Sequence, residues 1–235
     1  GLYKLVSIRT FKIFRGINKK GTMVEYQSEV DRGMVVLDVI LRIQTESAND
    51  MAVRWNCKAG KCGSCSVEIN GKPKLACMTR MNEYRPDETI MITPLKAFPI
   101  IKDTVTDVSW NYKQNLKIKP FSPAQNKNNT EKGLVMHQVD VERTQHFRKC
   151  IECYLCQNVC HVLRDNNKKE KFTGPRFMLR LASLEMHPLD TEDRIKDIKD
   201  FESYCNSLVN DTNSYDYCTN ILNNKYDNYI MSYDE

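Results

Sequence analysis

Alternating apolar and polar positions near the start of the chain predict two strands followed by a helix. Residues 4–13 and 23–27 alternate as extended segments do, and turn residues including two glycines separate them between 16 and 21. Apolar side chains between 36 and 43 then recur at helical spacing. This order predicts a sheet with one helix packed across it.

The pattern after residue 65 predicts the rest of this sheet. Residues 66–69 read as a strand, and Asn70-Gly71 is typical of a tight hairpin turn. The returning strand is expected to include residues 75–77, and residues 89–93 supply one more strand. We therefore expect a small mixed sheet in the first half of the chain.

The second half of the chain has a helical pattern instead. Residues 117–137 contain two prolines and a polar stretch, which predicts a linker or a surface excursion. Helical signals begin near Asp140, and Pro175 is placed to open a helix that ends before Pro188. Asp190 is expected to cap the next helix.

Composition and charge exclude several classes of protein. Apolar residues make up 41% and charged residues 28% of the chain, which is ordinary for a globular protein. The longest apolar runs are far below the roughly 18 residues of a membrane span, so we expect a protein that docks on a membrane at most. No secretion signal is expected at Gly1. The net charge of +5 comes from scattered lysines without a basic helix, so no nucleic-acid partner is expected.

The cysteines change this picture most. Eight of the ten fall into two tight groups, which favours metal binding in a reducing compartment over disulfides. The first group has the spacing C-x4-C-x2-C-x11-C, which is the plant-type spacing for a 2Fe–2S cluster. Its members are Cys57, Cys62, Cys65 and Cys77.

Glycines within the first group support the same interpretation. Gly60 and Gly63 permit positive φ angles and close approach of the backbone to a cluster. Their amides, with those of Lys61 and Ser64, are placed to donate to the sulfurs. The alternatives are a zinc site or unrelated buried thiols, but zinc sites favour paired C-x2-C units.

The second group has the spacing C-x2-C-x2-C-x3-C, formed by Cys150, Cys153, Cys156 and Cys160. This is the bacterial ferredoxin pattern, in which the fourth cysteine serves a different cluster from the first three. A zinc knuckle or a thiol cluster is the alternative. Covalent haem is disfavoured because Cys156, Cys160 and His161 form C-x3-C-H rather than C-x2-C-H.

The second cysteine group does not supply enough ligands for the clusters that its spacing predicts. Cys150, Cys153 and Cys156 leave a 4Fe–4S cluster one ligand short, and Cys160 leaves a 3Fe–4S cluster two short. Only Cys205 and Cys218 remain downstream. The chain is therefore one thiolate short of completing both clusters.

Four segments together resemble the iron–sulfur subunit of succinate dehydrogenase and fumarate reductase. They are residues 54–65, 75–77, 150–161 and 174–177, and the likeness extends over roughly residues 1–205. It is closer to the actinobacterial-style branch of this family than to the mitochondrial one. Two unlike cluster motifs in this order also indicate electron transfer between centres.

The resemblance implies an α+β fold. It implies a β-grasp 2Fe–2S ferredoxin domain at 1–115, a linker at 116–138 and an all-α helical ferredoxin domain at 139–235. It also implies a ligand set for each cluster. The 2Fe–2S cluster takes Cys57, Cys62, Cys65 and Cys77; the 4Fe–4S cluster takes Cys150, Cys153 and Cys156; the 3Fe–4S cluster takes Cys160 and Cys205.

The tail departs from the family pattern. The family has cysteines six and ten residues after the position of Cys205, where this chain has Asp211 and Tyr215. Cys218 lies three residues late and is a candidate for the fourth 4Fe–4S ligand if the loop carries an insertion. Three interpretations stay open for the 3Fe–4S cluster: an oxygen ligand from Asp211, Ser214 or Asp216, an inexact tail sequence, or real loss of the cluster.

By resemblance, the chain relays electrons from an FAD-containing flavoprotein subunit to quinone at a membrane anchor. It lacks a glycine-rich dinucleotide fingerprint, so flavin and dicarboxylate chemistry are assigned to the partner. His161 is a candidate donor to quinone, with helix capping or solvent exposure as the alternative. The expected location is the inner face of a bacterial cytoplasmic membrane or, alternatively, the matrix side of a mitochondrial inner membrane. A soluble or degenerate fumarate reductase-type subunit with an incomplete terminal cluster is the rival hypothesis.

Overall fold

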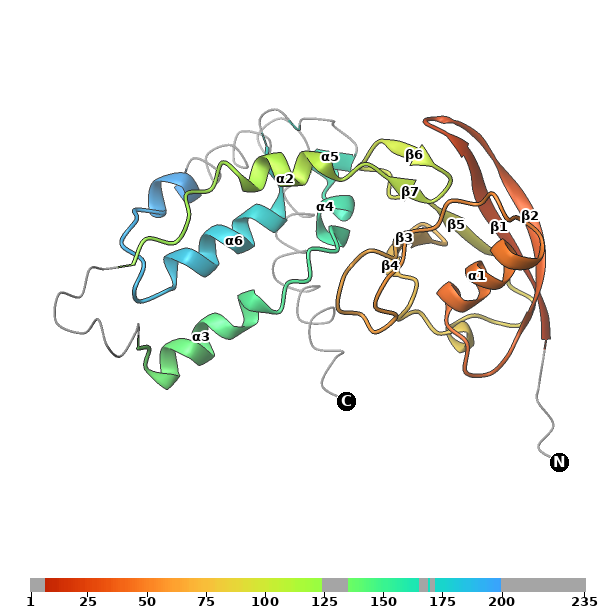
Figure 1. Cartoon of the computed structure of the whole chain (residues 1–235), viewed down its shortest axis with the longest axis horizontal. Coiled ribbons are helices and arrows are strands. Elements are labelled where there is room, and N and C mark those ends of the chain that lie inside the picture. Colours follow the sequence, from red (N-terminus) through yellow and green to blue (C-terminus); the bar gives the residue numbers. More distant parts are fainter. Residues whose placement is uncertain (1–6, 124–134, 165–168, 170–171, 200–235) are drawn as a thin grey trace.

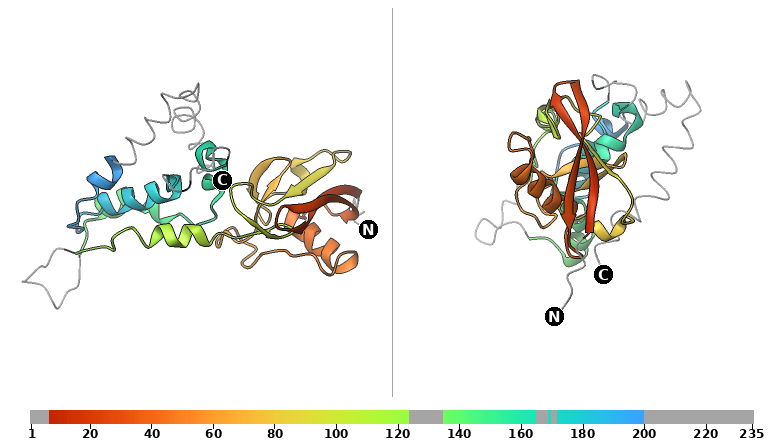
Figure 2. Two further views of the ribbon diagram at one scale, coloured as in Figure 1. Left: turned by 90° about the horizontal axis from the view of Figure 1, so that it is seen from above. Right: turned by 90° about the vertical axis from the view of Figure 1, so that its right-hand side faces the viewer.

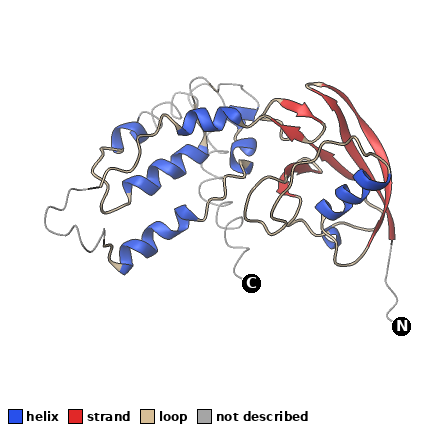
Figure 3. Ribbon diagram, in the orientation of Figure 1, coloured by secondary structure: helices blue, strands red, loops and turns tan. Residues whose placement is uncertain are grey.

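The computed structural model describes residues 7–123, 135–164, 169 and 172–199. Within them, the strands, one α-helix and a short 3-10 helix (Met81–Glu83) gather at one end of an elongated molecule, and the remaining helices occupy the other end (Figures 1 and 3). The predicted α+β class is confirmed. The limits predicted for two domains and a linker stay a prediction.

The sheet begins with a long antiparallel hairpin of β1 (Ser7–Ile17) and β2 (Lys20–Val30). Pairing continues up to Ile17 and Lys20, so the turn is much shorter than the sequence pattern predicts. Asn18 adopts a left-handed φ of 55°, which a tight hairpin turn requires. The glycines of the predicted turn are paired strand residues instead.

The remaining strands complete a mixed sheet in the order β4-β3-β5-β1-β6-β7, with β2 on β1. Strands β1 and β5 run parallel, and the other pairs are antiparallel. The bounds of these strands are β3 Ser66–Ile69, β4 Lys72–Leu75, β5 Ile90–Thr93, β6 Ile100–Lys102 and β7 Val105–Thr106.

Helix α1 (Val36–Glu46) packs its apolar face on this sheet, as predicted. Val36, Ile40 and Ile43 are at most 1% exposed and form one core with Phe11 of β1. Burial of such side chains contributes about 1.5–3 kcal/mol each. The helix and sheet therefore form a rigid support for the loops at their edges.

The predicted returning strand is partly wrong. Strand β4 ends at Leu75, and Ala76 and Cys77 lie in the turn that follows. The Ala76 amide still donates to the Cys65 carbonyl at 3.1 Å, so the two chain segments remain adjacent. Strands β6 and β7 escape prediction because they are only three and two residues long.

The other end of the molecule consists of short helices that lie roughly side by side (Figure 2). Helix α2 precedes residue 116 in the chain but packs here, because Trp110 contacts the ring of Phe177 edge-on at 6.3 Å. The bounds are α2 Ser109–Asn115, α3 Gln138–Arg148, α4 Leu155–Val159, α5 His161–Arg164 and α6 Pro175–Glu185.

Asp190 does not cap a helix as predicted. The next helical turn covers 195–199, and it is Asp193 that accepts from the Ile195 amide at 3.1 Å. Asp190 instead pairs with the fully buried Arg194 at 2.9 Å and accepts from the Ser122 amide. These contacts fasten the end of the described chain to the segment that follows α2.

Candidate iron–sulfur sites

Three cysteines of the first group, Cys57, Cys62 and Cys65, lie on a loop between α1 and β3, and the fourth follows β4. Cys65 directly precedes β3, and Cys77 lies two residues beyond β4. Because β3 and β4 pair from Ser66 to Leu75, their hairpin brings the two cysteines together. The Cys77 amide donates to the Cys65 sulfur at 3.4 Å. The hairpin thus explains how two cysteines separated by eleven residues in the chain become neighbours, while their role as ligands stays a prediction.

Backbone conformation shapes the rest of this loop around sulfur. Gly60 and Gly63 have φ angles of 63° and 69°, as a tight wrapping loop requires. The amides of Ala59 and Lys61 both donate to the Cys57 sulfur, at 3.4 and 3.2 Å. Amide donors of this kind stabilise thiolates and cluster sulfur. Lys61 was an expected donor, whereas Ala59 was not.

Two thiols of this group have opposite electrostatic surroundings. A hydrogen bond with the Ser64 hydroxyl, 3.0 Å from the sulfur, and nearby backbone amides lower the pKa of Cys62 to about 6. Burial raises the pKa of Cys65 to about 12. Iron binds the thiolate form, so Cys62 is already in its ligand form at neutral pH, and the metal must displace the proton of Cys65.

The second group occupies a turn that leads from α3 into α4. Cys150 and Cys153 lie in the turn, Cys156 lies in the first turn of α4, and Cys160 follows its last residue. Glu152 and Tyr154 take left-handed φ angles of 56° and 59°, unusual for non-glycine residues. The surrounding packing must hold them in this conformation.

Burial controls the thiols of this second group. It raises the pKa of Cys153 and brings that of Cys156 to about 12. The neighbouring Cys150 acts in the same direction, whereas the positive charge of Arg176 opposes it. The thiols thus lie close enough to influence each other, as ligands of a shared centre must. A cluster bound here would have to displace the protons of these thiols, because the thiolate is the ligand form.

Two buried amides within the second group connect it to distant segments. The Gln157 amide nitrogen donates to Asn111 at 3.2 Å and to the Thr173 carbonyl at 3.0 Å. Its oxygen accepts from the Arg176 backbone amide at 3.2 Å. Gln157 is fully buried and every polar atom of its amide has a partner. It therefore joins α2, α4 and the start of α6.

Asn158 makes the corresponding connection to the sheet. Its amide nitrogen donates to the fully buried Glu68 of β3 at 2.8 Å, and its oxygen accepts from the Ala97 amide at 2.9 Å. Arg164 of α5 completes the network with two hydrogen bonds to the Glu68 carboxylate, at 2.6 and 3.3 Å. A buried ion pair of this kind fixes geometry, since breaking it leaves an uncompensated charge.

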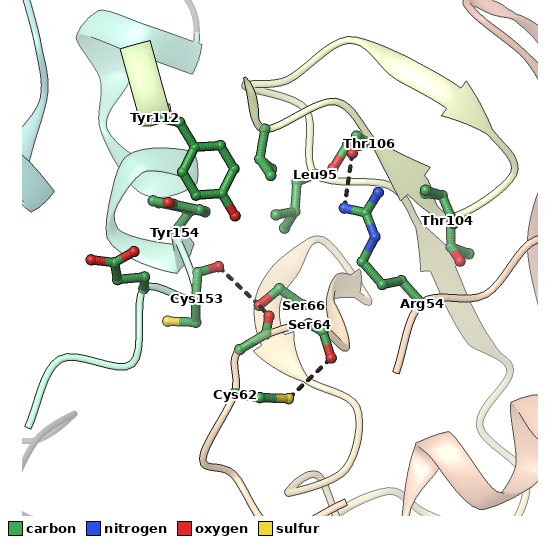
Figure 4. Close-up of a pocket in the computed structure, with 14 residues that line it drawn as sticks. Arg54, Cys62, Ser64, Ser66, Leu95, Thr104, Thr106, Tyr112, Cys153 and Tyr154 are labelled. Atoms are coloured by element: carbon green, nitrogen blue, oxygen red, sulfur yellow. Dashed lines mark hydrogen bonds between the residues drawn. The ribbon is translucent and has the colours of Figure 1, made fainter. Parts of the chain in front are cut away.

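The two cysteine groups touch directly. A side chain at Gly63 would place its Cβ only 2.6 Å from the Cys153 Cα. The Ser66 hydroxyl bridges the groups, because it lies 2.9 Å from the Cys153 carbonyl and 2.8 Å from the Gly63 carbonyl. Figure 4 shows Cys62 and Cys153 on the wall of one cavity of about 120 Å³ between the sheet end and the helical end.

The described residues place some of the remaining predicted ligands. Cys160 is half-buried, and His161, the candidate quinone contact, begins α5 beside it. Within the same residues, no three His, Cys, Asp or Glu side chains converge closely enough to hold a single metal ion. The positions discussed for the tail lie outside the described residues: Cys205, Asp211, Ser214, Tyr215, Asp216 and Cys218.

Sequence reasoning missed the residues that hold the second group in place. Glu68 is far along the chain from Asn158 and Arg164, and Arg176 is similarly separated from Glu152, so each of these partnerships forms only in the folded protein. One signal was available, because Glu68 stands between two apolar residues of a strand. A charged residue at such a position requires a partner.

Comparisons with known proteins agree with this geometry. A family model described as a 2Fe–2S iron–sulfur cluster binding domain matches residues 10–113. The chain is 52% identical to a chain in the structure of the Mycobacterium smegmatis Sdh1 complex in the apo form, with a TM-score of 0.79. That match covers 83% of this chain and 81% of the other.

Curated relatives extend the comparison. The fumarate reductase iron–sulfur subunit of Mycobacterium tuberculosis is 31% identical over 179 residues, which cover 76% of this chain and 70% of that protein. An uncharacterized iron–sulfur protein of Methanococcus maripaludis is 33% identical over 179 residues, 75% of this chain. The chain spans only 34% of that longer relative. None of the helices in the described residues is long and apolar enough to cross a membrane.

Proposed function

Because the chain belongs to the family of succinate dehydrogenase and fumarate reductase iron–sulfur subunits, we propose that it is the electron-transfer subunit of a succinate:quinone oxidoreductase. It takes electrons from an FAD-containing flavoprotein subunit and passes them to quinone at a membrane anchor. The chain itself performs no dicarboxylate chemistry. Its location is peripheral, on the inner face of a bacterial cytoplasmic membrane, with the mitochondrial inner membrane as the alternative.

The observation that carries this proposal is the direct contact between the two cysteine groups. Electron transfer slows steeply with distance, so centres that exchange electrons must be held close together. The Ser66 hydroxyl connects the segment after Cys65 to the Cys153 carbonyl, and Gly63 allows the backbones to touch. An unrelated pair of metal sites has no need of such a contact.

The residues of the first group fit a 2Fe–2S cluster, which exchanges single electrons when bound. Cys57, Cys62, Cys65 and Cys77 are its ligands. The amide donors at Ala59 and Lys61 stabilise negative charge on sulfur. Because the pKa of Cys62 is lowered to about 6, this residue is a thiolate at neutral pH and needs no general base.

The second group is proposed to serve two further clusters. Cys150, Cys153 and Cys156 hold a 4Fe–4S cluster, with Cys218 as the candidate fourth ligand. Cys160 and Cys205 would hold a 3Fe–4S cluster, which would supply single electrons at the quinone end of the relay. His161 donates a hydrogen bond to the quinone carbonyl, which is consistent with its position directly after Cys160.

A second candidate function follows from the tail sequence. Asp211 and Tyr215 occupy positions where the family has cysteines, so the terminal cluster is one thiolate short. A subunit without that cluster would hold the complex together and end the relay early. It would contain about six irons, against about nine for all three clusters.

Low-temperature EPR of the purified complex tests the proposal. We expect a near-isotropic signal from the air-oxidised sample, as a 3Fe–4S cluster gives, and a rhombic 2Fe–2S signal after reduction with dithionite. A rhombic signal without the near-isotropic one favours the second candidate. Absence of both signals from an iron-loaded sample contradicts electron transfer by this chain.

A further inference from the structure

Arg176, the second residue of α6, is a buried cation beside the second cysteine group. Only 7% of its surface is exposed. Arginine is seldom buried to this extent unless its charge is compensated. The groups that surround the guanidinium therefore indicate the function of its positive charge.

Arg176 contacts the residues directly before and directly after the segment from Cys153 to Cys156. Its guanidinium forms an ion pair with Glu152, the residue directly before Cys153. Its backbone amide donates to the side chain of Gln157, the residue directly after Cys156, at 3.2 Å. The positive charge is thereby held against this short stretch of chain.

The compensation of this charge is incomplete in the described part of the chain. Glu152 is 42% exposed, so water screens its side of the ion pair. The Nε atom of Arg176 is buried and has no hydrogen-bond partner among the described residues. A buried cationic donor without an acceptor is costly, and native proteins rarely keep one without a function.

Cluster sulfur would supply the missing acceptor. Thiolate-ligated clusters carry net negative charge, and their reduction potentials depend on nearby charges and on hydrogen bonds to sulfur. Reduction adds one electron and so one more negative charge. A fixed cation stabilises the reduced form more than the oxidised form, and an arginine stays charged throughout the pH range in which proteins fold.

We propose that Arg176 raises the reduction potential of the cluster bound by Cys150, Cys153 and Cys156, through its positive charge and its buried Nε–H donor. Arg176 is a positioning residue, since it neither carries the electron nor ligates iron. This inference rests on the proposed 4Fe–4S cluster at these cysteines. A purely structural role is the alternative, in which Arg176 only holds Glu152 in its left-handed conformation.

An EPR-monitored redox titration of the complete iron-loaded complex separates these roles. In Arg176→Met, the ratio of reduced to oxidised second cluster at a fixed potential should fall about tenfold, or about 59 mV for one electron. In Glu152→Gln, loss of the compensating anion should shift the ratio in the opposite direction. Arg176→Lys keeps the charge and should lie between Arg176→Met and the unaltered protein.

Two internal controls make the result interpretable. Arg180→Met removes a charge from the exposed face of the same helix and should leave the second potential unchanged. The first cluster should keep its potential in every variant. Thermal unfolding and iron content of each variant show whether the site is still assembled.

Shifts of opposite sign in Arg176→Met and Glu152→Gln support the proposal, because a structural role does not depend on the sign of the removed charge. Unchanged potentials in both variants overturn it, as do shifts in the same direction. If the unaltered complex shows no 4Fe–4S cluster that needs Cys153, the proposed function fails at this site before any variant is compared.

Discussion

The two cysteine groups illustrate two ways of building a site for the same element. The first is local: a glycine-containing loop and one hairpin bring its four cysteines together, and amides within the loop serve the sulfur. The second is distributed, because side chains from distant elements hold its turn. Gln157 contacts α2 and the start of α6 at Arg176, and Asn158 contacts β3. The residues of a local site can be recognised from the sequence, whereas those of a distributed site come together only in the completed fold.

Their electrostatics differ accordingly. In the first group a hydroxyl and backbone amides lower the pKa of Cys62 to about 6. In the second group burial is the dominant influence on Cys153 and Cys156, and the opposing charge comes from Arg176 on another helix. Burial raises the pKa of Cys65 in the first group as it does in the second, so the difference is that local dipoles lower the pKa of Cys62, whereas in the second group the opposing charge belongs to a remote side chain.

The largest expected effect comes from removing one cysteine of each group. Cys65→Ala should abolish the rhombic EPR signal and remove about two irons, because the 2Fe–2S cluster loses a buried ligand. Cys153→Ala should remove about four irons and leave that signal intact. Loss of both clusters in either variant would show that the two sites do not assemble separately, contrary to the comparison above.

The next effect concerns the network that joins the two regions. Glu68→Ala removes the buried carboxylate that Asn158 and Arg164 share, and should lower the free energy of unfolding by about 3–5 kcal/mol. Urea unfolding of the iron-loaded protein measures this loss.

A matched control for Glu68 is available on the surface. Asp87 and Arg85 form an ion pair in which both side chains are 80% exposed, at 3.9 Å. Asp87→Ala should change the free energy of unfolding by no more than about 0.5 kcal/mol. Equal losses in Glu68→Ala and Asp87→Ala would mean that the buried network contributes nothing beyond an exposed pair.

A smaller effect tests the contact between the groups. Gly63 and Gly71 both have positive φ angles, 69° and 76°, so alanine costs about 1–2 kcal/mol at either position. Only at Gly63 does the added Cβ also collide with Cys153, because nothing lies within 4 Å at Gly71. Gly63→Ala should therefore destabilise by about 1–3 kcal/mol more than Gly71→Ala. Calorimetry on both variants gives the difference, and a value near zero would refute a rigid contact.

The mildest prediction concerns pH. In the reduced, iron-free chain, Cys62 should react with iodoacetamide at a rate that is half-maximal near pH 6, because only the thiolate reacts and its pKa is lowered to about 6. The rate should rise with pH through that value. Cys156, with a pKa of about 12, should stay unreactive at neutral pH. Peptide mass spectrometry resolves the two sites.

Ser64→Ala provides the control for that experiment. Removal of the hydroxyl takes away the largest influence on Cys62, so the half-maximal rate should move to higher pH. The reactivity of Cys156 should not change. An unchanged pH profile for Cys62 would assign its reactivity to the backbone amides alone.

For the local site, the sequence predicts most of the elements that carry the cysteines, but not the turn in which Cys77 lies. The α1 face, strand β3 and the spacing of the first cysteines follow from periodicity and turn chemistry, and the structure confirms the elements. The predictions that were wrong or missing concern elements that are short or that depend on tertiary contacts. Strands β6 and β7 are too short for an alternating pattern to be recognised. Asp190 forms a buried ion pair with Arg194 instead of capping a helix.

The distributed site was predictable only in its cysteines. Spacing identified Cys150 to Cys160, but nothing in a linear pattern pairs Glu68 with Arg164, or Arg176 with Glu152, across such separations. Those pairs depend on how the helices pack on the sheet. Burial of a charge shows that a partner is needed, but it does not say which residue supplies it.

Gly174 has a consequence for the variation that this fold tolerates. It opens α6 with a φ of 89°, and a Cβ there would lie 2.1 Å from the Gln157 side-chain oxygen. Two obstacles therefore keep position 174 a glycine: the side chain of Gln157 fills the space, and the φ angle is one that other residues rarely adopt. A smaller residue at 157 would remove only the first obstacle and would also lose the contacts to Asn111 and Thr173, so a glycine far along the chain and a glutamine inside the cysteine motif are expected to persist together.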